Sequence, residues 1–223
     1  SMGVDVGDFN LDGLPDLWVS NYERENNAMY RNLGKGLFRH VSRSIGIAAL
    51  GAMYVGWGTR FLDADLDGDE DLIQSGGNGV VGVLLGRGDG TFYSVAWVNV
   101  GYTVQDIHVE DMNHDGKDDV MTSDGSTIRY YAGNGEATFQ SPHAYSSSGA
   151  TRFQLGDVNG DGNSDVLTNG GAAVLGRGNG EFYASSQYGH GSSNGIGLGD
   201  LNGDKVVDAV LIRNAPTGGS VDA

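Results

Sequence analysis

Short apolar segments alternate along the chain with clusters of acidic side chains. Residues 4–6, 59–61, 107–109, 153–155 and 196–198 each precede such a cluster, and a further apolar segment follows it. The apolar residues in these segments recur with a period of two, which predicts β-strands with one buried face. We therefore expect an all-β protein in which acidic loops join neighbouring strands.

The acidic clusters are copies of one motif. They read DFNLDGLPDL from residue 8, DADLDGDEDL from residue 63, DMNHDGKDDV from residue 111, DVNGDGNSDV from residue 157 and DLNGDKVVDA from residue 200. The shared pattern is D-x-[DN]-x-D-G-x-x-D, and successive copies begin 43 to 55 residues apart. A motif that returns at nearly constant spacing predicts a protein built from structural repeats. We call these copies loops 1 to 5 and number their positions from the first Asp.

A second element repeats in phase with the loops. It reads NLGKGLF at 32–38, LGRGDGTF at 85–92, AGNGEATF at 132–139 and LGRGNGEF at 175–182, which is typical of a β-hairpin with a glycine turn. One repeat then holds four strands, the content of a propeller blade. We predict a single β-propeller domain over 1–223, with four complete blades of four antiparallel strands at 3–50, 53–100, 104–146 and 150–190, and a partial fifth at 194–223.

The loop pattern suits a hard divalent cation. Side-chain oxygens at positions 1, 3, 5 and 9 and a backbone carbonyl at position 7 converge if the chain turns sharply at Gly in position 6, and Ca²⁺ takes six to eight such oxygens. EF-hands instead place the last acidic ligand at position 12 between helices. The predicted ligands are Asp8, Asn10, Asp12, Leu14, Asp16, Asp63, Asp65, Asp67, Asp69, Asp71, Asp111, Asn113, Asp115, Lys117, Asp119, Asp157, Asn159, Asp161, Asn163, Asp165, Asp200, Asn202, Asp204, Val206 and Asp208.

Loop 5 departs from the pattern because Lys205 replaces the glycine at position 6. A lysine there is strained at positive φ and brings an ammonium group near the ligands. We expect up to five Ca²⁺ ions, with the fifth site the most doubtful. His114, at position 4 of loop 3, is expected to lie on the surface and not to bind the metal.

Composition narrows the class of partner. The formal net charge is −16, which disfavours nucleic acid and anionic membranes. There is no cysteine and no run of 18 apolar residues, so we expect no disulfide and no membrane span. The predicted loops claim most of the paired carboxylates, and the five histidines fit no triad or metal spacing. We therefore expect no catalytic activity.

The five loops and the hairpins resemble FG-GAP or VCBS repeats, which also form the integrin α-subunit propeller. Residues 4–75, with VGDFNLDGLPDLWVSNYE and VGWGTRFLDADLDGDEDL, look more like the ASPIC/UnbV branch. The resemblance implies a β-propeller with Ca²⁺ in the loop between the first two strands of each blade. The family includes adhesion receptors, lectins and accessory domains of enzymes, so the resemblance does not settle the activity.

We expect a structural or binding scaffold for protein or carbohydrate partners, secreted or on the cell surface, from a bacterium. Two alternatives stay open: a non-catalytic accessory domain of a secreted enzyme, and an engineered or recombined propeller without a ligand of its own. The fifth repeat holds only two clear strands. Residues 213–223 could supply a third strand, the chain could be part of a larger propeller, or chains could associate edge to edge as a homo-oligomer.

Overall fold

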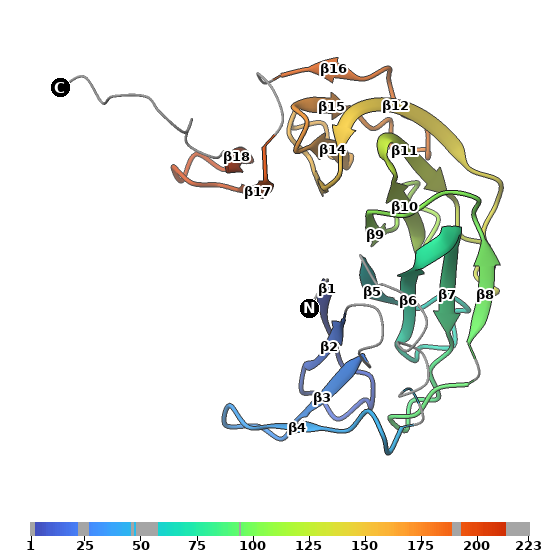
Figure 1. Ribbon diagram of the computed structural model, residues 1–223. Coiled ribbons are helices and arrows are strands. Elements are labelled where there is room, and N and C mark those ends of the chain that lie inside the picture. The colour runs from blue at the N-terminus through green and yellow to red at the C-terminus, as the bar shows by residue number, and fades with distance from the viewer. Residues whose placement is uncertain are drawn as a thin grey trace, which may run out of the picture.

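A computed structural model describes residues 3–21, 27–45, 47, 58–93, 95–188 and 193–212. The strands form four four-stranded sheets and one two-stranded sheet, which we call blades 1 to 5 (Figure 1). Blade 1 holds β1 (Gly3–Gly7), β2 (Asp16–Ser20), β3 (Ala28–Asn32) and β4 (Phe38–His40), and blade 2 holds β5 (Thr59–Leu62), β6 (Asp71–Gly76), β7 (Val80–Leu84) and β8 (Ala96–Asn99).

The other three blades follow in chain order. Blade 3 holds β9 (Asp106–Glu110), β10 (Asp119–Ser123), β11 (Gly125–Tyr131) and β12 (His143–Ala150). Blade 4 holds β13 (Phe153–Gly156), β14 (Asp165–Thr168), β15 (Ala172–Val174) and β16 (Ser186–Gln187), and blade 5 holds β17 (Gly195–Gly199) and β18 (Asp208–Ile212). All pairings within the blades are antiparallel between consecutive strands, which confirms the predicted all-β propeller.

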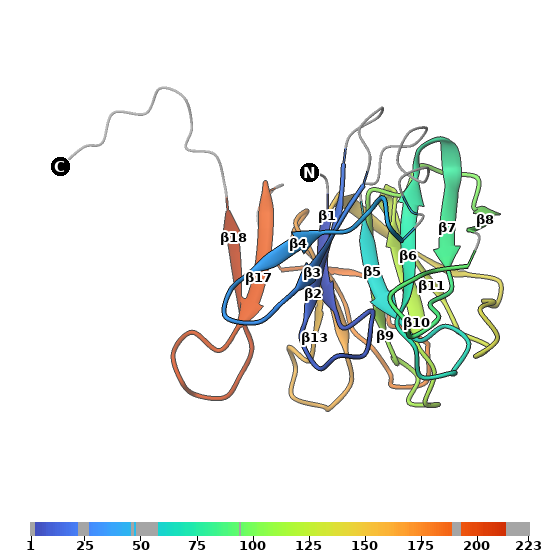
Figure 2. The ribbon, with the colours of Figure 1, turned by 90° about the horizontal axis from the view of Figure 1, so that it is seen from below.

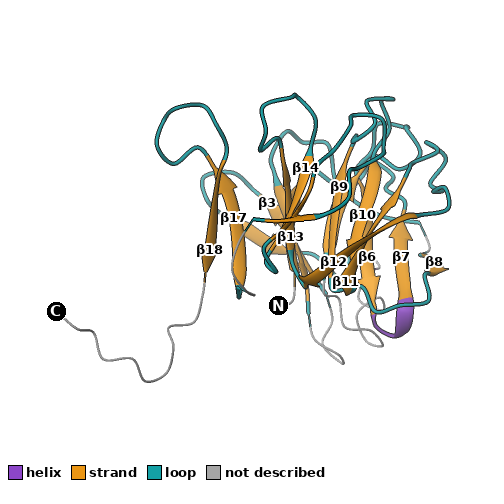
Figure 3. Ribbon diagram, turned by 90° about the horizontal axis from the view of Figure 1, so that it is seen from above, coloured by secondary structure: helices purple, strands orange, loops and turns teal. Residues whose placement is uncertain are grey.

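The blades are arranged side by side around an axis. The first strand of each blade packs against the first strand of the next, in the order β1, β5, β9, β13 and β17 (Figure 1). In Figure 1 the arc stays open between β17–β18 and β1–β2. Figure 2 shows that the loops after β1, β13 and β17 all extend from the same end of the blades, and Figure 3 shows the same for the loops after β13 and β17.

Three clusters of buried apolar side chains join consecutive blades. Phe9, Trp18, Met29, Leu72 and Phe92 pack between blades 1 and 2. A second cluster fills the space between blades 2 and 3, and a third, which includes Phe153 and Phe182, lies between blades 3 and 4. Since a four-stranded sheet has two faces to cover, this packing between sheets supplies the core.

The exposure of equivalent residues in the first strands shows the effect of a neighbouring blade. Thr59, Ile107 and Phe153 occupy equivalent positions in the first strands of blades 2 to 4, and each is 0% exposed. Val4, at the same position of blade 1, is 57% exposed. The difference arises because no blade of the described chain lies on that side of β1.

A short helical turn joins two strands of blade 2. The sequence itself favours such a turn only in the connection 41–53, most of which lies outside the described residues, as do residues 213–223. A 3₁₀ turn at Gly77–Gly79 joins β6 to β7, with Asn78 at φ 63°. The sequence GGNGV carries the glycine and asparagine that such a turn requires. Among the described residues no helix is long and apolar enough to cross a membrane.

Candidate metal sites in the blade loops

Each acidic loop is closed by the same strand register. The residue before position 1 pairs with the Asp at position 9 in all five blades: Gly7 with Asp16, Leu62 with Asp71, Glu110 with Asp119, Gly156 with Asp165 and Gly199 with Asp208. The strands therefore hold positions 1 and 9 next to each other. The intervening loop must fold back over this pair, which brings its polar side chains together.

Side-chain hydrogen bonds to the backbone shape every loop. The carboxylate at position 1 accepts a hydrogen bond from the backbone amide of position 6. The distance is 2.7 Å between Gly13 N and Asp8 Oδ2 and 2.9 Å between Lys205 N and Asp200 Oδ2. The carboxylate at position 5 accepts the amide of position 7, as in Asp67 Oδ1 with Asp69 N at 2.9 Å. These turns use oxygens from the predicted ligand set, so the acids also fold their own loop.

Two positions of each loop have left-handed backbone. Position 6 was predicted to need it, and its φ is 86° at Gly68 and 67° at Lys205. Position 4 also has positive φ, at 63° in Leu66 and 60° in His114, which sequence reasoning missed. The signal was present in loops 4 and 5, where Gly160 and Gly203 occupy that position. His114 is exposed, as the sequence predicted.

The carboxylate at position 9 is buried in the four complete blades. Asp16, Asp119 and Asp165 are 0% exposed and Asp71 is 1% exposed. One oxygen of each accepts a backbone amide from the start of the hairpin in the same blade. The distances are 2.6 Å from Asn32 N to Asp16, 2.7 Å from Gly86 N to Asp71, 2.9 Å from Gly133 N to Asp119 and 2.8 Å from Gly176 N to Asp165. We call this contact the hairpin clamp.

The second oxygen at position 9 holds the loop itself. It accepts a hydrogen bond from the backbone amide of position 2, at 2.8 to 3.1 Å, in loops 2, 3 and 4. The donors are Ala64, Met112 and Val158. The hairpin glycine of the clamp also lies against the carbonyl of position 8, where a Cβ on Gly86 or Gly176 would collide with Glu70 O or Ser164 O. Position 9 was predicted only as a ligand, and the structure adds its part in joining loop and hairpin.

Burial and neighbouring acids favour the protonated form of these carboxyl groups. Burial raises the pKa of Asp71 to about 7, and the nearby charges of Asp65 and Asp67 add to the shift. Burial also raises the pKa of Asp16, Asp119 and Asp165. A cation among these oxygens would supply the missing positive charge and favour the ionised forms.

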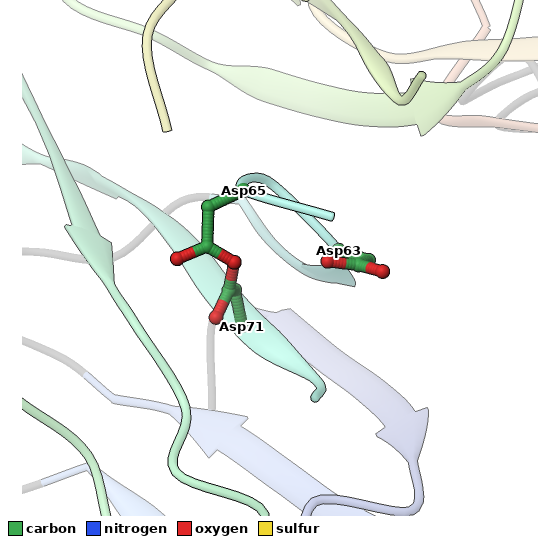
Figure 4. A group of neighbouring side chains, drawn as sticks. All are labelled: Asp63, Asp65 and Asp71. Atoms are coloured by element: carbon green, nitrogen blue, oxygen red, sulfur yellow. The ribbon is translucent and has the colours of Figure 1, made fainter. Parts of the chain in front are cut away.

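Loop 2 brings three predicted ligands together. Asp63, Asp65 and Asp71 each offer an oxygen atom, and these three atoms lie within 4.8 Å of one another, the one such group of acidic or histidine side chains found in the described residues (Figure 4). Asp63 and Asp65 come from the loop and Asp71 from the start of β6. Positions 1, 3 and 9 of this loop therefore face a common point.

Buried oxygens without hydrogen-bond partners test whether the loops fit a cation. Among the described residues, Asp63 Oδ1 in loop 2 and Asn10 Oδ1 in loop 1 are buried side-chain oxygens with no partner. They occupy positions 1 and 3 of their loops, which are predicted ligand positions. An unpaired buried oxygen is costly, and a metal ion would satisfy it. The oxygen donor set and these two atoms fit Ca²⁺.

Two loops have a cation from the protein beside position 5. Arg31 lies 2.9 Å from the carboxylate of Asp12 in loop 1, and Lys117 lies 3.6 Å from that of Asp115 in loop 3. Loop 2 has neither, and its position 7 is Asp69. Burial and the neighbouring Asp67 raise the pKa of Asp69. Loop 2 thus has the highest density of uncompensated acids.

Comparisons with known proteins support the fold. The sequence profile of the FG-GAP-like repeat matches residues 8–74, 63–122 and 111–168. No curated protein matches the chain at a significant level. Many solved structures are similar to this chain, including the three that follow. An Agrocybe aegerita lectin, described as specifically recognising non-reducing terminal N-acetylglucosamine, has a TM-score of 0.58 and 22% identity over 82% of this chain.

The other two structures are more distant in sequence. The V. cholerae biofilm matrix protein Bap1 has a TM-score of 0.55 and 19% identity over 93% of this chain. BBS1N in complex with ARL6DN has a TM-score of 0.52 and 11% identity over 88% of this chain. The chain spans 50%, 34% and 58% of these three structures in turn. At such identities they share the fold with this chain. The repeat matches cover most of the chain, which therefore belongs to the FG-GAP-like repeat family.

Proposed function

We propose that the loops bind Ca²⁺ and that the protein is a calcium-stabilised binding scaffold without catalytic activity. The observation that carries this proposal is the convergence of Asp63, Asp65 and Asp71, with Asp63 Oδ1 buried and unpaired. Calcium would neutralise each loop and join its side chains to the first strands of the blade. Binding would then be coupled to folding, because the unfolded chain does not hold these oxygens together.

The partner we propose is a carbohydrate or a protein outside the cytosol. The lectin and the biofilm matrix protein among the similar structures support this class of partner and this location. Oxygen-rich loops with few ligands from outside the loop suit the millimolar calcium of extracellular fluids. The net charge of −16 gives no electrostatic attraction toward nucleic acid or anionic lipid.

A second candidate is a non-catalytic module of a longer secreted protein. The chain spans 34% of the similar matrix protein, so this fold occurs within larger architectures. The exposed Val4 and Val6, at 57% and 55%, offer an apolar face that a further blade would cover. An accessory domain of an enzyme and edge-to-edge association between chains are both compatible with that face.

Titration calorimetry with Ca²⁺ on chelator-stripped protein tests the metal proposal. We expect heat of binding at several sites, and a Tm that rises with calcium and falls with EDTA. The double variant Asp63→Asn/Asp65→Asn should lose at least one site while keeping the hydrogen-bond capacity of the loop. Glu136→Gln, an exposed acid outside the loops, is the matched control. Absence of calcium uptake by the unmodified protein would contradict the proposal.

A glycan array probed with calcium-loaded protein tests the partner class. Binding to particular glycans would support carbohydrate as the partner. An array without binding would favour a protein partner, which crosslinking on intact cells would then identify. Oligomeric state, measured by light scattering with and without calcium, tests association between chains.

A further inference from the structure

A polar pocket lies between blades 3 and 4. Its volume is about 290 Å³. Blade 3 contributes residues from loop 3, from β11 and from the segment that leads into β12, and the hairpin of blade 4 closes the other side. The lining residues are Asn113, Tyr130, Ala132, Gln140, Ser141, His143, Asn179, Gly180 and Glu181.

The chemistry of this pocket differs from that of the preceding interface. Between blades 2 and 3 lies an apolar groove of about 420 Å³, lined by Ile73, Val83, Val120 and Phe139 among others. The hairpins of blades 2, 3 and 4 can be aligned on their first glycine. The residue three positions before that glycine is Val83 in blade 2, Tyr130 in blade 3 and Ala173 in blade 4. Of these, the tyrosine alone brings a hydroxyl group to the interface.

Loop 3 holds the base of the pocket in place. The Tyr130 hydroxyl donates to Asp119 Oδ2 at 2.9 Å and accepts from Asn113 Nδ2 at 3.2 Å. Gly180 lies so close to the Tyr130 ring that a Cβ would collide with it. Phe182 packs edge-on against the same ring at 5.9 Å. The side chains at the base are therefore fixed by the predicted metal loop on one side and by blade 4 on the other.

The lining selects for a small neutral polar ligand. The described lining residues include no lysine or arginine, and His143 is the one side chain among them that can become positively charged, so a phosphate or sulfate group would meet no permanent cation there. Asn113, Gln140 and Asn179 offer amides, Ser141 offers a hydroxyl, His143 offers an imidazole, and Glu181 offers a carboxylate that Arg177 contacts at 3.3 Å. The Tyr130 hydroxyl already donates to Asp119, so it can only accept a hydrogen bond from a ligand. Such a set both donates and accepts hydrogen bonds, as the hydroxyl groups of a sugar require. The volume lies just below the range of about 300 to 1,000 Å³ that is typical of pockets for drug-sized ligands, which suits one small molecule.

We propose that this pocket binds a single saccharide unit and that calcium in loop 3 strengthens the binding. The proposal rests on the proposed function, because it takes carbohydrate as the partner. Asn113 and Asp119 are predicted ligands in loop 3 and also hold Tyr130 through its hydroxyl. A metal that orders these two side chains thereby orders the base of the pocket. Gln140 and Glu181 are exposed and lie on opposite sides, where they would contact the sugar directly.

Saturation-transfer difference NMR on the calcium-loaded chain tests the proposal. The probes are the methyl glycosides of N-acetylglucosamine, glucose and galactose, the first because the similar lectin recognises it. We expect transfer to at least one sugar, with the dissociation constant raised tenfold or more in Gln140→Ala and in Glu181→Gln. Glu136→Gln, on the hairpin of blade 3 outside the pocket lining, should leave it unchanged. EDTA should weaken binding in the unmodified chain.

The outcomes separate this proposal from the broader one. If none of the three sugars binds, or if Gln140→Ala and Glu181→Gln bind as well as the unmodified chain, the pocket does not hold a saccharide. Calcium uptake measured on the same samples decides the metal proposal independently. Glycan binding that survives both pocket substitutions would retain carbohydrate as the partner and place it elsewhere. Circular dichroism of each variant verifies that the blades are folded.

Discussion

Loops 2 and 5 have the same backbone pattern but different surroundings. In both, position 1 accepts the amide of position 6, and positions 4 and 6 have positive φ. Asp71, at position 9 of loop 2, is 1% exposed and bonds to Ala64 N and Gly86 N. Asp208, at position 9 of loop 5, is partly exposed and bonds to Leu201 N alone among its described contacts.

The comparison separates the interactions that shape a loop from those that bury its position 9 carboxylate. The Asp and Asn turns are local, so loop 5 forms the shape even with Lys205 at position 6. The hairpin clamp and the cover of a following blade are not local, and the described part of blade 5 has neither. Shape is thus encoded within the motif, while burial of the position 9 carboxylate depends on the rest of the blade.

Removal of the position 9 carboxylate should have the largest effect. Asp71→Ala leaves two buried amides without acceptors, and we expect a loss of about 3 kcal/mol in the free energy of unfolding. Asp208→Ala, the matched change in blade 5, should cost less than about 1 kcal/mol because water reaches that site. Urea denaturation of both variants in EDTA measures the difference. Equal losses would refute the role assigned to the clamp.

Calcium should stabilise through loop 2 more than through loop 5. At calcium 100-fold above the dissociation constant, one site contributes about 2.7 kcal/mol to stability. We expect Asp63→Asn/Asp65→Asn to remove a contribution of this size and Asp200→Asn to remove little. Melting curves with and without calcium give the two contributions. A larger loss from Asp200→Asn would reverse the ranking of the sites.

Without calcium, the stability should fall as the pH rises from about 4 to about 7. The pKa of Asp71 is about 7 in the folded chain and 3.8 for an unperturbed aspartate, so the folded chain binds the extra proton in this range. The expected decrease from Asp71 is on the order of 2 kcal/mol after allowance for solvent screening. Urea denaturation at pH 4.5 and 7.5 in EDTA measures it.

The same pH experiment has an internal control. Asp16, Asp119 and Asp165 also have raised pKa values, so the quantity of interest is the difference between the unmodified chain and Asp71→Asn. The variant should show a smaller decrease. Saturating calcium should flatten the dependence, because the metal favours the ionised carboxylates. An identical slope in the variant would show that Asp71 is not the titrating group.

The smallest effect should come from the backbone of loop 5. Lys205 has φ 67°, a conformation that glycine adopts without a steric penalty. Lys205→Gly should stabilise the chain by about 1 kcal/mol and strengthen calcium binding by loop 5, since it also removes an ammonium group. Calorimetry on the variant measures both. Gly68→Lys in loop 2 is the reciprocal change and should weaken that loop.

The repeated motif made most of the fold predictable. Five phased loops with flanking strands indicated four-stranded blades because strand period, turn glycines and motif spacing agreed. Individual ligand positions followed from the motif, and three of them in loop 2 do converge. The match to the FG-GAP-like repeat does not test the ASPIC/UnbV assignment of residues 4–75, which stays a prediction.

Contacts between distant segments could not be predicted in the same way. The clamp joins Asp71 to Gly86, and the motif contains no sign of which amide the carboxylate accepts. The polar pocket depends on Tyr130 meeting the hairpin of the next blade, a contact set by the sheet packing. Leu66 and His114 at positive φ also contradict their residue preferences, because loop closure outweighs the local cost.

Two contacts between consecutive blades each join a loop of one blade to the hairpin of the blade that follows it. Phe9 of loop 1 stacks with Phe92 in the hairpin of blade 2, and Ala64 O of loop 2 accepts Ala137 N from the hairpin of blade 3. Loops 1 and 2 are thus docking surfaces for the blade that follows each of them. An ion lost from one loop would loosen its successor more than its predecessor, so calcium depletion would spread toward the C-terminal end of the chain.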